Sequence, residues 1–136
     1  MIIDAENLIL GRAASFIAKR ALLGDKIDII NCEKAIVIGD RKGIIAKYKQ
    51  SYDRGIPSKG PFLYKNPEKF FKRTVRGMLP RKRERGEIAL KNIKCYQGAP
   101  DNLKGEHIKI KTAALSQKNI HYITIKDICR SLGAKI

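Results

Sequence analysis

The chain has 136 residues, enough for one domain with a buried core, and its 43% hydrophobic and 31% charged residues are typical of a globular protein. Its 29 lysines and arginines outnumber its 13 aspartates and glutamates, and the net charge of +16 favours a polyanionic partner. A membrane protein is disfavoured because no apolar run approaches the ~18 residues that a span requires, and the acidic N-terminal segment is unlike a signal peptide, which predicts a cytosolic protein.

The N-terminal third predicts a strand, a helix and a second strand. A short apolar strand over 1–4 precedes a helix over 8–23, whose alanines and isoleucines recur at helical spacing. Residues 26–31 are rich in isoleucine and predict the next strand, so the two strands should be parallel with a right-handed crossover. A run over 35–38 either pairs antiparallel or caps the sheet edge, and a helix with a basic outer face follows from 41 or 42 to about 50.

Residues 51–65 hold two glycines, two prolines and two serines, and we interpret them as an ordered excursion rather than a linker. The reason is that Tyr52, Phe62 and Tyr64 are interleaved with the turn residues. These aromatic side chains either anchor the loop onto its own domain, which we favour, or stack on unpaired bases beside lysine and arginine.

The most basic stretch runs from Asn66 to Gly86. Asn66 is the predicted N-cap of a helix that begins at Pro67 and ends near Gly77. One face of this helix is expected to be cationic and the other to pack, with Lys69, Lys72, Arg73 and Arg76 on the first and Phe71, Val75 and Met78 on the second. Pro80 lies beyond the helix, and a basic turn that Gly86 closes contributes Arg81, Lys82, Arg83 and Arg85.

Residues 69–85 contain eight lysines or arginines and a single acid, Glu84, so this stretch carries +7 of the net +16. A charged helix face is ordinarily a solvated face with mixed signs. Here like charges at i,i+4 repel one another, and only an anionic partner removes that cost. Binding to a phosphate backbone releases counterions, so the stretch predicts contact with nucleic acid.

The C-terminal part predicts a helix over 87–92, a strand over 93–96 and a polar segment over 101–105. The alternation over 107–112 suits an edge strand or an extended arm. A last helix is expected to be capped by Thr124, with Asp127 three residues on, and to end at Gly133, with an apolar stripe of Ile125, Ile128, Cys129 and Leu132.

The sequence disfavours an enzyme. Neither phosphate-binding glycine motif, GxGxxG or GxxxxGK[ST], is present. His107 and His121 are not spaced as a catalytic site, and we interpret the three separated cysteines, Cys32, Cys95 and Cys129, as small buried apolar residues rather than disulfide or metal-site residues. We therefore expect no catalytic residue, no cofactor, no metal and no small-molecule substrate.

Three stretches resemble the family of ribosomal protein L thirteen of the large subunit, in its archaeal and eukaryotic form. They are IIDAENLILGRAASFIAKRALLGDK at 2–26, VIGDRKG at 37–43 and VRGMLPRKRERGEIALKNIKCYQG at 75–98. The segment VRGMLP, followed by a basic turn and a K-x-Y-x-G strand, is highly specific to that family. The resemblance covers about residues 1–104, and the tail fits the archaeal branch loosely through ITIKDICRSLG.

The resemblance implies a three-layer α/β/α domain over 1–104, with a small, mostly parallel central sheet of about four strands and helices on both faces. Residues 105–136 would be a C-terminal extension whose short helix packs on this domain. The resemblance also implies a structural role in the cytoplasmic ribosome, where the chain would bind large-subunit rRNA and abut neighbouring ribosomal proteins. The family's RNA-contacting segment matches 76–82, whereas bacterial members have a His-rich loop where this chain has SYDRGIPSKGPF, so contacts from that loop are not carried over.

The predicted RNA contacts combine the basic helix, the basic turn and two cations of the excursion, and RNA shape would supply most of the specificity. They are Lys69, Lys72, Arg73, Arg76, Gly77, Pro80, Arg81, Lys82, Arg83, Arg85, Arg54 and Lys59. The alternatives are an RNA-modifying or nucleotide-using enzyme with a cofactor near Gly11 or Gly39, and a DNA-packaging protein.

Overall fold

A computed structural model describes residues 1–103, 107–115 and 120–136. Its centre is a parallel sheet with strand order β1-β2-β4, formed by β1 (Ile2–Asp4), β2 (Ile27–Ile30) and β4 (Ile93–Cys95). The predicted strand–helix–strand unit is confirmed, with α1 (Leu10–Leu22) between β1 and β2. This helix begins two residues later than expected because Leu8 and Ile9 form β-bridges and Ile9 has extended backbone angles.

A second, two-stranded sheet lies beside the first. Its strands, β3 (Ile36–Ile38) and β5 (Tyr122–Thr124), are antiparallel, which decides between the two alternatives for the run over 35–38. α2 (Arg41–Asp53) follows β3 and extends three residues past the predicted end, and Asp40 caps it by accepting a hydrogen bond from the Gly43 amide at 2.9 Å. Thr124 caps α5 (Ile125–Ser131) in the predicted way, through a 3.2 Å hydrogen bond from the Asp127 amide.

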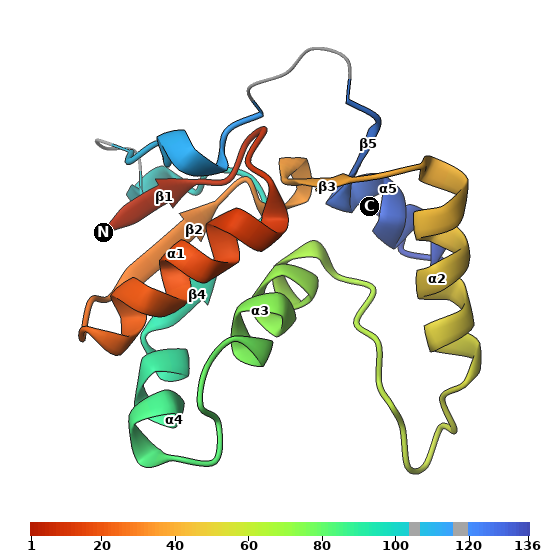
Figure 1. Cartoon of the computed structure of the whole chain (residues 1–136), viewed down its shortest axis with the longest axis horizontal. Helices are drawn as coiled ribbons and strands as arrows, with labels where there is room; N and C mark the ends of the chain where they lie inside the picture. Colours follow the sequence, from red (N-terminus) through yellow and green to blue (C-terminus); the bar gives the residue numbers. More distant parts are fainter. Residues whose placement is uncertain (104–106, 116–119) are drawn as a thin grey trace.

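The helix α1 contacts both α3 (Pro67–Gly77) and α4 (Glu84–Lys91), and the three helices lie on one side of the parallel sheet (Figure 1). Alternation along the strands directs Ile3, Ile29 and Ile93 toward these helices, and all three are fully buried. The opposite face combines apolar and polar side chains, because the buried Ile30 and the half-buried Ile2 lie there with Asp4, Asp28 and Lys94. The class is thus mixed α/β with a small, mostly parallel sheet, as predicted.

The residues after 104 contribute to this core. Ile108 donates a backbone hydrogen bond to Ile2 and forms a parallel bridge with Ile3, so the alternating segment lies at the β1 edge. Ile110 and the apolar stripe of α5 are buried in the same cluster as α1 and α3. Three short 3₁₀ helices, Cys32–Lys34, Asp101–Leu103 and Lys111–Ala113, complete the described elements. None of the helices over the described ranges has the length and apolar character of a membrane span.

Candidate nucleic-acid interface

α3 is fixed in the core by one apolar face. Phe71 and Val75 are fully buried, as their helical spacing predicts. Met78 was expected beside them but is 43% exposed, because the helix ends at Gly77 and the next buried side chain is Leu79. The predicted side-chain cap by Asn66 is also wrong, since this residue closes the first turn only through its carbonyl, which accepts a hydrogen bond from the Phe70 amide at 2.9 Å.

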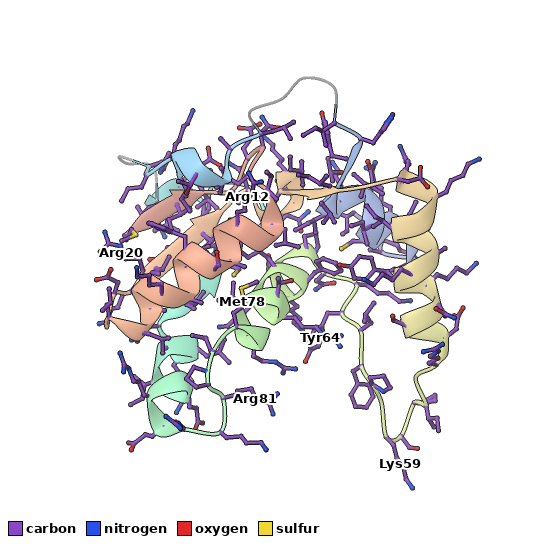
Figure 2. The ribbon with its side chains drawn as sticks, in the orientation of Figure 1. Arg12, Arg20, Lys59, Tyr64, Met78 and Arg81 are labelled. Atoms are coloured by element: carbon purple, nitrogen blue, oxygen red, sulfur yellow. The ribbon has the colours of Figure 1, made fainter. Side chains whose placement is uncertain are left out.

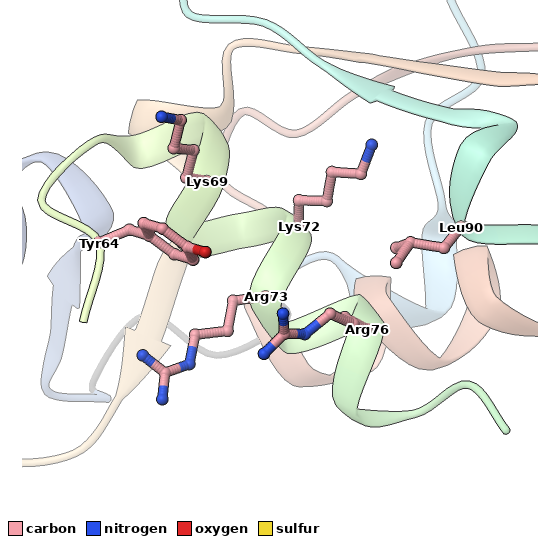
Figure 3. Close-up of a pocket in the computed structure, with 6 residues that line it drawn as sticks. All are labelled: Tyr64, Lys69, Lys72, Arg73, Arg76 and Leu90. Carbon is pink, nitrogen blue, oxygen red and sulfur yellow. The ribbon is translucent and has the colours of Figure 1, made fainter. Parts of the chain in front are cut away.

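The opposite face of α3 presents its four predicted cations to a hollow of about 280 Å³. The residues that line it are Tyr64, Lys69, Lys72, Arg73, Arg76 and Leu90. Figure 3 shows Tyr64 between the side chains of Lys69 and Arg73, with Leu90 of α4 on the other side. The structure therefore brings together cations that helical spacing places on one face, and it adds two apolar walls that come from other segments.

Uncharged groups hold three of these cations in place. The Nζ atom of Lys72 donates a 2.6 Å hydrogen bond to the Ile93 carbonyl, and Nη1 of Arg73 donates one of 2.6 Å to the Phe62 carbonyl. The Nζ atom of Lys69 lies 5.8 Å from the centre of the Tyr64 ring. A carbonyl or a ring orients a cation without supplying a counter-charge.

Among the residues that the structure describes, no carboxylate forms an ion pair with this stretch. The ion pairs of the described residues are Arg20 with Asp25, Lys34 with Glu6 and Lys91 with Glu87, and all three lie outside 69–85. Like charges are thus concentrated at one place without internal compensation, which is the electrostatic requirement for a phosphate-binding surface.

Arg73 also connects α3 to α2. It borders a hollow with Tyr48 and Phe70, whose rings are 5.1 Å apart and join the two helices. Burial raises the pKa of Tyr48, and the positive charge of Arg73 opposes that rise. The guanidinium therefore lies where the loop, α2 and α3 meet.

The basic turn is held by one buried side chain and one close backbone contact. Leu79 is buried, whereas Arg81, Lys82 and Arg83 are exposed. Gly86 does not close the turn as predicted but lies in the first turn of α4, because Arg83 is the extended N-cap and the helix begins at Glu84. A Cβ atom at position 86 would lie 2.3 Å from the Pro80 carbonyl oxygen, so only glycine allows this approach.

A second hollow of about 360 Å³ continues the first toward this turn. It is lined by Arg73, Arg76, Gly77, Leu79, Arg81 and Lys82, so Arg73 and Arg76 border both hollows. We call the residues that line the two hollows the basic groove. Most of the predicted contacts of α3 and the turn belong to it, and Figure 2 shows Arg81 on the turn.

Arg85 has a partner elsewhere in the fold. Its Nε and Nη2 atoms donate to the carbonyl of Leu22, at 3.4 and 3.0 Å, where α1 ends. Carbonyls in the last turn of a helix lack an intrahelical donor, so the side chain caps α1 from α4. Sequence spacing did not predict this contact because 63 residues separate the two.

The excursion places Arg54 and Lys59 outside the lining of the basic groove. Arg54 follows the end of α2, and Lys59 lies at the tip of the loop (Figure 2). Our preference for the loop aromatics as anchors is wrong, since Tyr52, Phe62 and Tyr64 are 40%, 58% and 38% exposed. The half-buried Leu63 between them packs on the core instead.

The histidines and cysteines considered for catalysis or metal binding lie in different parts of the fold, apart from one pair of cysteines. His107 and His121 are exposed, and no group of three or more potential metal ligands occurs over the described ranges. Cys32 and Cys129 are buried as predicted, and burial raises the pKa of Cys129 to about 11. Sequence reasoning missed that Cys32 is a neighbour of the half-buried Cys95. Interaction with the Cys95 side chain, together with burial, raises the pKa of the Cys32 thiol, whose Sγ donates to the Ile29 carbonyl at 3.6 Å.

Comparison with known proteins adds an independent finding. Residues 1–102 match the model of the family described as "Ribosomal protein L13". The "Large ribosomal subunit protein uL13" of Archaeoglobus fulgidus is 45% identical over 135 residues, which cover 97% of this chain and 86% of that protein. Proteins of the same name from Methanosarcina barkeri and Thermoplasma volcanium are 42% and 39% identical, with 98% and 97% of both chains covered.

Proposed function

Because the chain belongs to the ribosomal protein L13 family, we propose that it is a structural, non-enzymatic constituent of the large ribosomal subunit in the cytoplasm. In this proposal it binds large-subunit rRNA through the basic groove and the adjoining turn, abuts other ribosomal proteins and supports subunit assembly. The observation that carries the RNA-binding role is the row of α3 cations held by carbonyls and a ring rather than by carboxylates.

The proposed contacts divide by how the fold presents them. Lys69, Arg73 and Arg76 form the centre, and the exposed cations of the turn, Arg81, Lys82 and Arg83, extend it. Lys72 and Arg85 each donate to a backbone carbonyl of the chain, so they would contact phosphate with their remaining N–H groups. Arg54 and Lys59 would make contacts away from the groove, on the loop.

Gly77 and Pro80 would contribute through shape rather than charge. A Cβ atom added at Gly77 would have no heavy atom of the protein within 4 Å, so the backbone is open to a close approach from outside. We expect Gly77→Ala to leave stability unchanged or raise it by up to about 1 kcal/mol, since alanine is the better helix former. A simultaneous loss of rRNA affinity would place the RNA against this backbone.

The direct test is charge reversal in the groove. For Arg76→Glu with Arg81→Glu we expect weaker binding to large-subunit rRNA and a flatter dependence of log K on log salt. Each lost phosphate contact should change that slope by about 0.7 to 0.9. Filter binding over a series of salt concentrations measures both quantities.

The matched control is Arg12→Glu with Lys19→Glu, which changes the net charge by the same amount on the exposed side of α1. Arg12 lies on α1, apart from Arg81 on the turn (Figure 2). The control should retain most of the slope. An equal loss in both double variants would mean that net charge, and not the groove, governs binding.

We also propose that residues 1–104 form the RNA-binding domain and 105–136 an extension packed on it. In support, the family match spans 1–102 and every residue of the groove precedes 104. Ile110, Ile125 and Ile128 are buried in the common core. Deletion of the extension should therefore lower the stability of the chain more than it lowers rRNA binding by the groove. Thermal unfolding of the truncated chain, with and without rRNA, separates the two effects.

A further inference from the structure

The hollow beside Tyr64 combines two kinds of surface that a purely phosphate-binding site does not need. Four cations line it together with the faces of an aromatic and an aliphatic side chain, Tyr64 and Leu90. Its volume of about 280 Å³ is just below the range of about 300–1,000 Å³ typical of small-molecule sites. A space of this size suits one nucleotide and is too small for a stacked base pair with its backbone.

The Tyr64 ring is exposed yet held in place. It remains 38% exposed, while Lys69 lies 5.8 Å from its centre. The chain on its N-terminal side is fixed twice, because Leu63 packs on the core and the Phe62 carbonyl accepts the 2.6 Å hydrogen bond from Arg73. An aromatic side chain placed in advance at the edge of a cationic hollow loses little conformational entropy when a ligand stacks on it.

The two arginines of the hollow are placed for one phosphate group. Arg73 uses Nη1 for the Phe62 carbonyl and keeps its other N–H groups, and the side chain of Arg76 has no hydrogen bond or ion pair within the described part of the chain. Guanidinium groups bind phosphate oxygens in a bidentate manner. Figure 3 shows both guanidinium groups on the same side of Tyr64.

We propose that this hollow receives a single unpaired nucleotide of the bound RNA, with its base stacked on Tyr64 and its phosphate held by Arg73 and Arg76. The inference rests on the proposed RNA-binding function. It adds that the RNA bound at this hollow is single-stranded rather than duplex. A paired base in an A-form helix does not offer its face to a protein side chain, whereas an extruded base does. Leu90 on the far side of the hollow would exclude water from the base.

Two eight-nucleotide probes separate stacking from phosphate binding. One is fluorescein-labelled octaadenylate, and the other is an octamer of abasic ribose phosphates with the same label and the same charge. The full-length protein should bind octaadenylate more tightly than the abasic octamer. Tyr64→Ala should weaken octaadenylate binding about 5- to 150-fold, the range for loss of one stacked base, and leave abasic binding and the salt slope unchanged.

Two further variants serve as controls. Tyr64→Phe keeps the π-face and should retain the preference for octaadenylate. Tyr122→Ala removes a tyrosine that is 47% exposed on β5, outside the groove, and should behave as the wild type. Equal octaadenylate affinity for the wild type and Tyr64→Ala, or an equal loss in Tyr122→Ala, would overturn the inference.

The outcomes also distinguish this inference from the proposed function. If large-subunit rRNA binds with a steep salt slope while Tyr64→Ala has no effect, the groove binds phosphates and the nucleotide site is refuted. If the wild type binds neither rRNA nor octaadenylate at roughly 50 mM salt, the proposed function itself fails. If octaglutamate peptide binds the hollow and Tyr64→Ala weakens that binding as much as octaadenylate binding, the site fits an acidic protein segment and the nucleotide proposal is overturned.

Discussion

Two arginines of this chain, Arg20 on α1 and Arg73 on α3, differ in that the first has a charged partner and the second a neutral one. Arg20 lies 3.8 Å from a carboxylate oxygen of Asp25 and 5.9 Å from the centre of the Phe16 ring. Arg73 donates instead to the Phe62 carbonyl at 2.6 Å. The carboxylate cancels much of the field of Arg20 at a distance, whereas the carbonyl orients Arg73 and leaves its charge uncompensated.

The difference shows that the number of cations on a surface does not by itself make an anion-binding site. α1 and α3 both expose basic side chains and both pack in the same core. They differ in what orients those side chains.

The largest expected effect comes from removing the side chain that fixes α3. Phe71 is fully buried, so Phe71→Ala should lower the free energy of unfolding by about 3–5 kcal/mol. Phe62 is 58% exposed, and Phe62→Ala should change the free energy of unfolding by less than about 0.5 kcal/mol. Urea unfolding at equilibrium measures both values. Similar losses for the two variants would show that α3 is not held by the packing described above.

A smaller effect is expected at the contact between the basic turn and α4. The Cβ atom of Gly86→Ala would approach the Pro80 carbonyl oxygen to 2.3 Å, and relief of this clash should cost about 1–3 kcal/mol of stability. Because the backbone of the turn must shift, rRNA affinity should fall as well.

Gly11→Ala is the matched control for Gly86→Ala. A Cβ atom at Gly11, in the first turn of α1, has no heavy atom within 4 Å, so alanine should stabilise the helix by up to about 1 kcal/mol without a change in rRNA affinity. Thermal unfolding measures the change in stability of both variants, and filter binding measures their rRNA affinity. A Gly86→Ala protein as stable as the wild type would contradict the close contact.

A third effect is expected at Arg85, whose side chain links α4 to the end of α1. Arg85→Ala removes the donors to the Leu22 carbonyl and should lower stability by about 0.5–1.5 kcal/mol, the usual contribution of one hydrogen bond. Arg85→Lys should recover part of this loss, since an ammonium group also donates. If Arg85 in addition contacts phosphate, the salt slope of rRNA binding should fall in Arg85→Ala, which loses the charge, and stay unchanged in Arg85→Lys, which keeps it.

Sequence spacing predicted features that lie within one element. It placed the four cations of α3 on one face, Phe71 and Val75 on the other, and the first two strands in a parallel unit. These predictions hold because helical and β periodicities are local and each element buries one face.

The misses arise where one element meets another. Helical spacing assigned Met78 to the core, but the helix ends one residue earlier and Leu79 is buried instead. The carbonyls that hold Lys72 and Arg73, and the Tyr64 and Leu90 walls of the hollow, come from other segments. The sequence of α3 alone contains no signal for them.

The smallest effects are expected for Arg20 and Arg73, which differ in whether their partner is charged. Arg20→Gln removes one partner of an exposed ion pair, with side chains 46% and 38% exposed, so stability should change by about 0–1 kcal/mol. Its removal also leaves Asp25 uncompensated, so the net field of that surface changes, yet the salt slope of rRNA binding should stay constant. Arg73→Gln should lower that slope by about 0.7 to 0.9, because a phosphate contact is lost. Filter binding of the two single variants over the same salt series measures both slopes at equal net charge, and equal slopes would mean that the partner of an arginine does not decide whether it binds RNA.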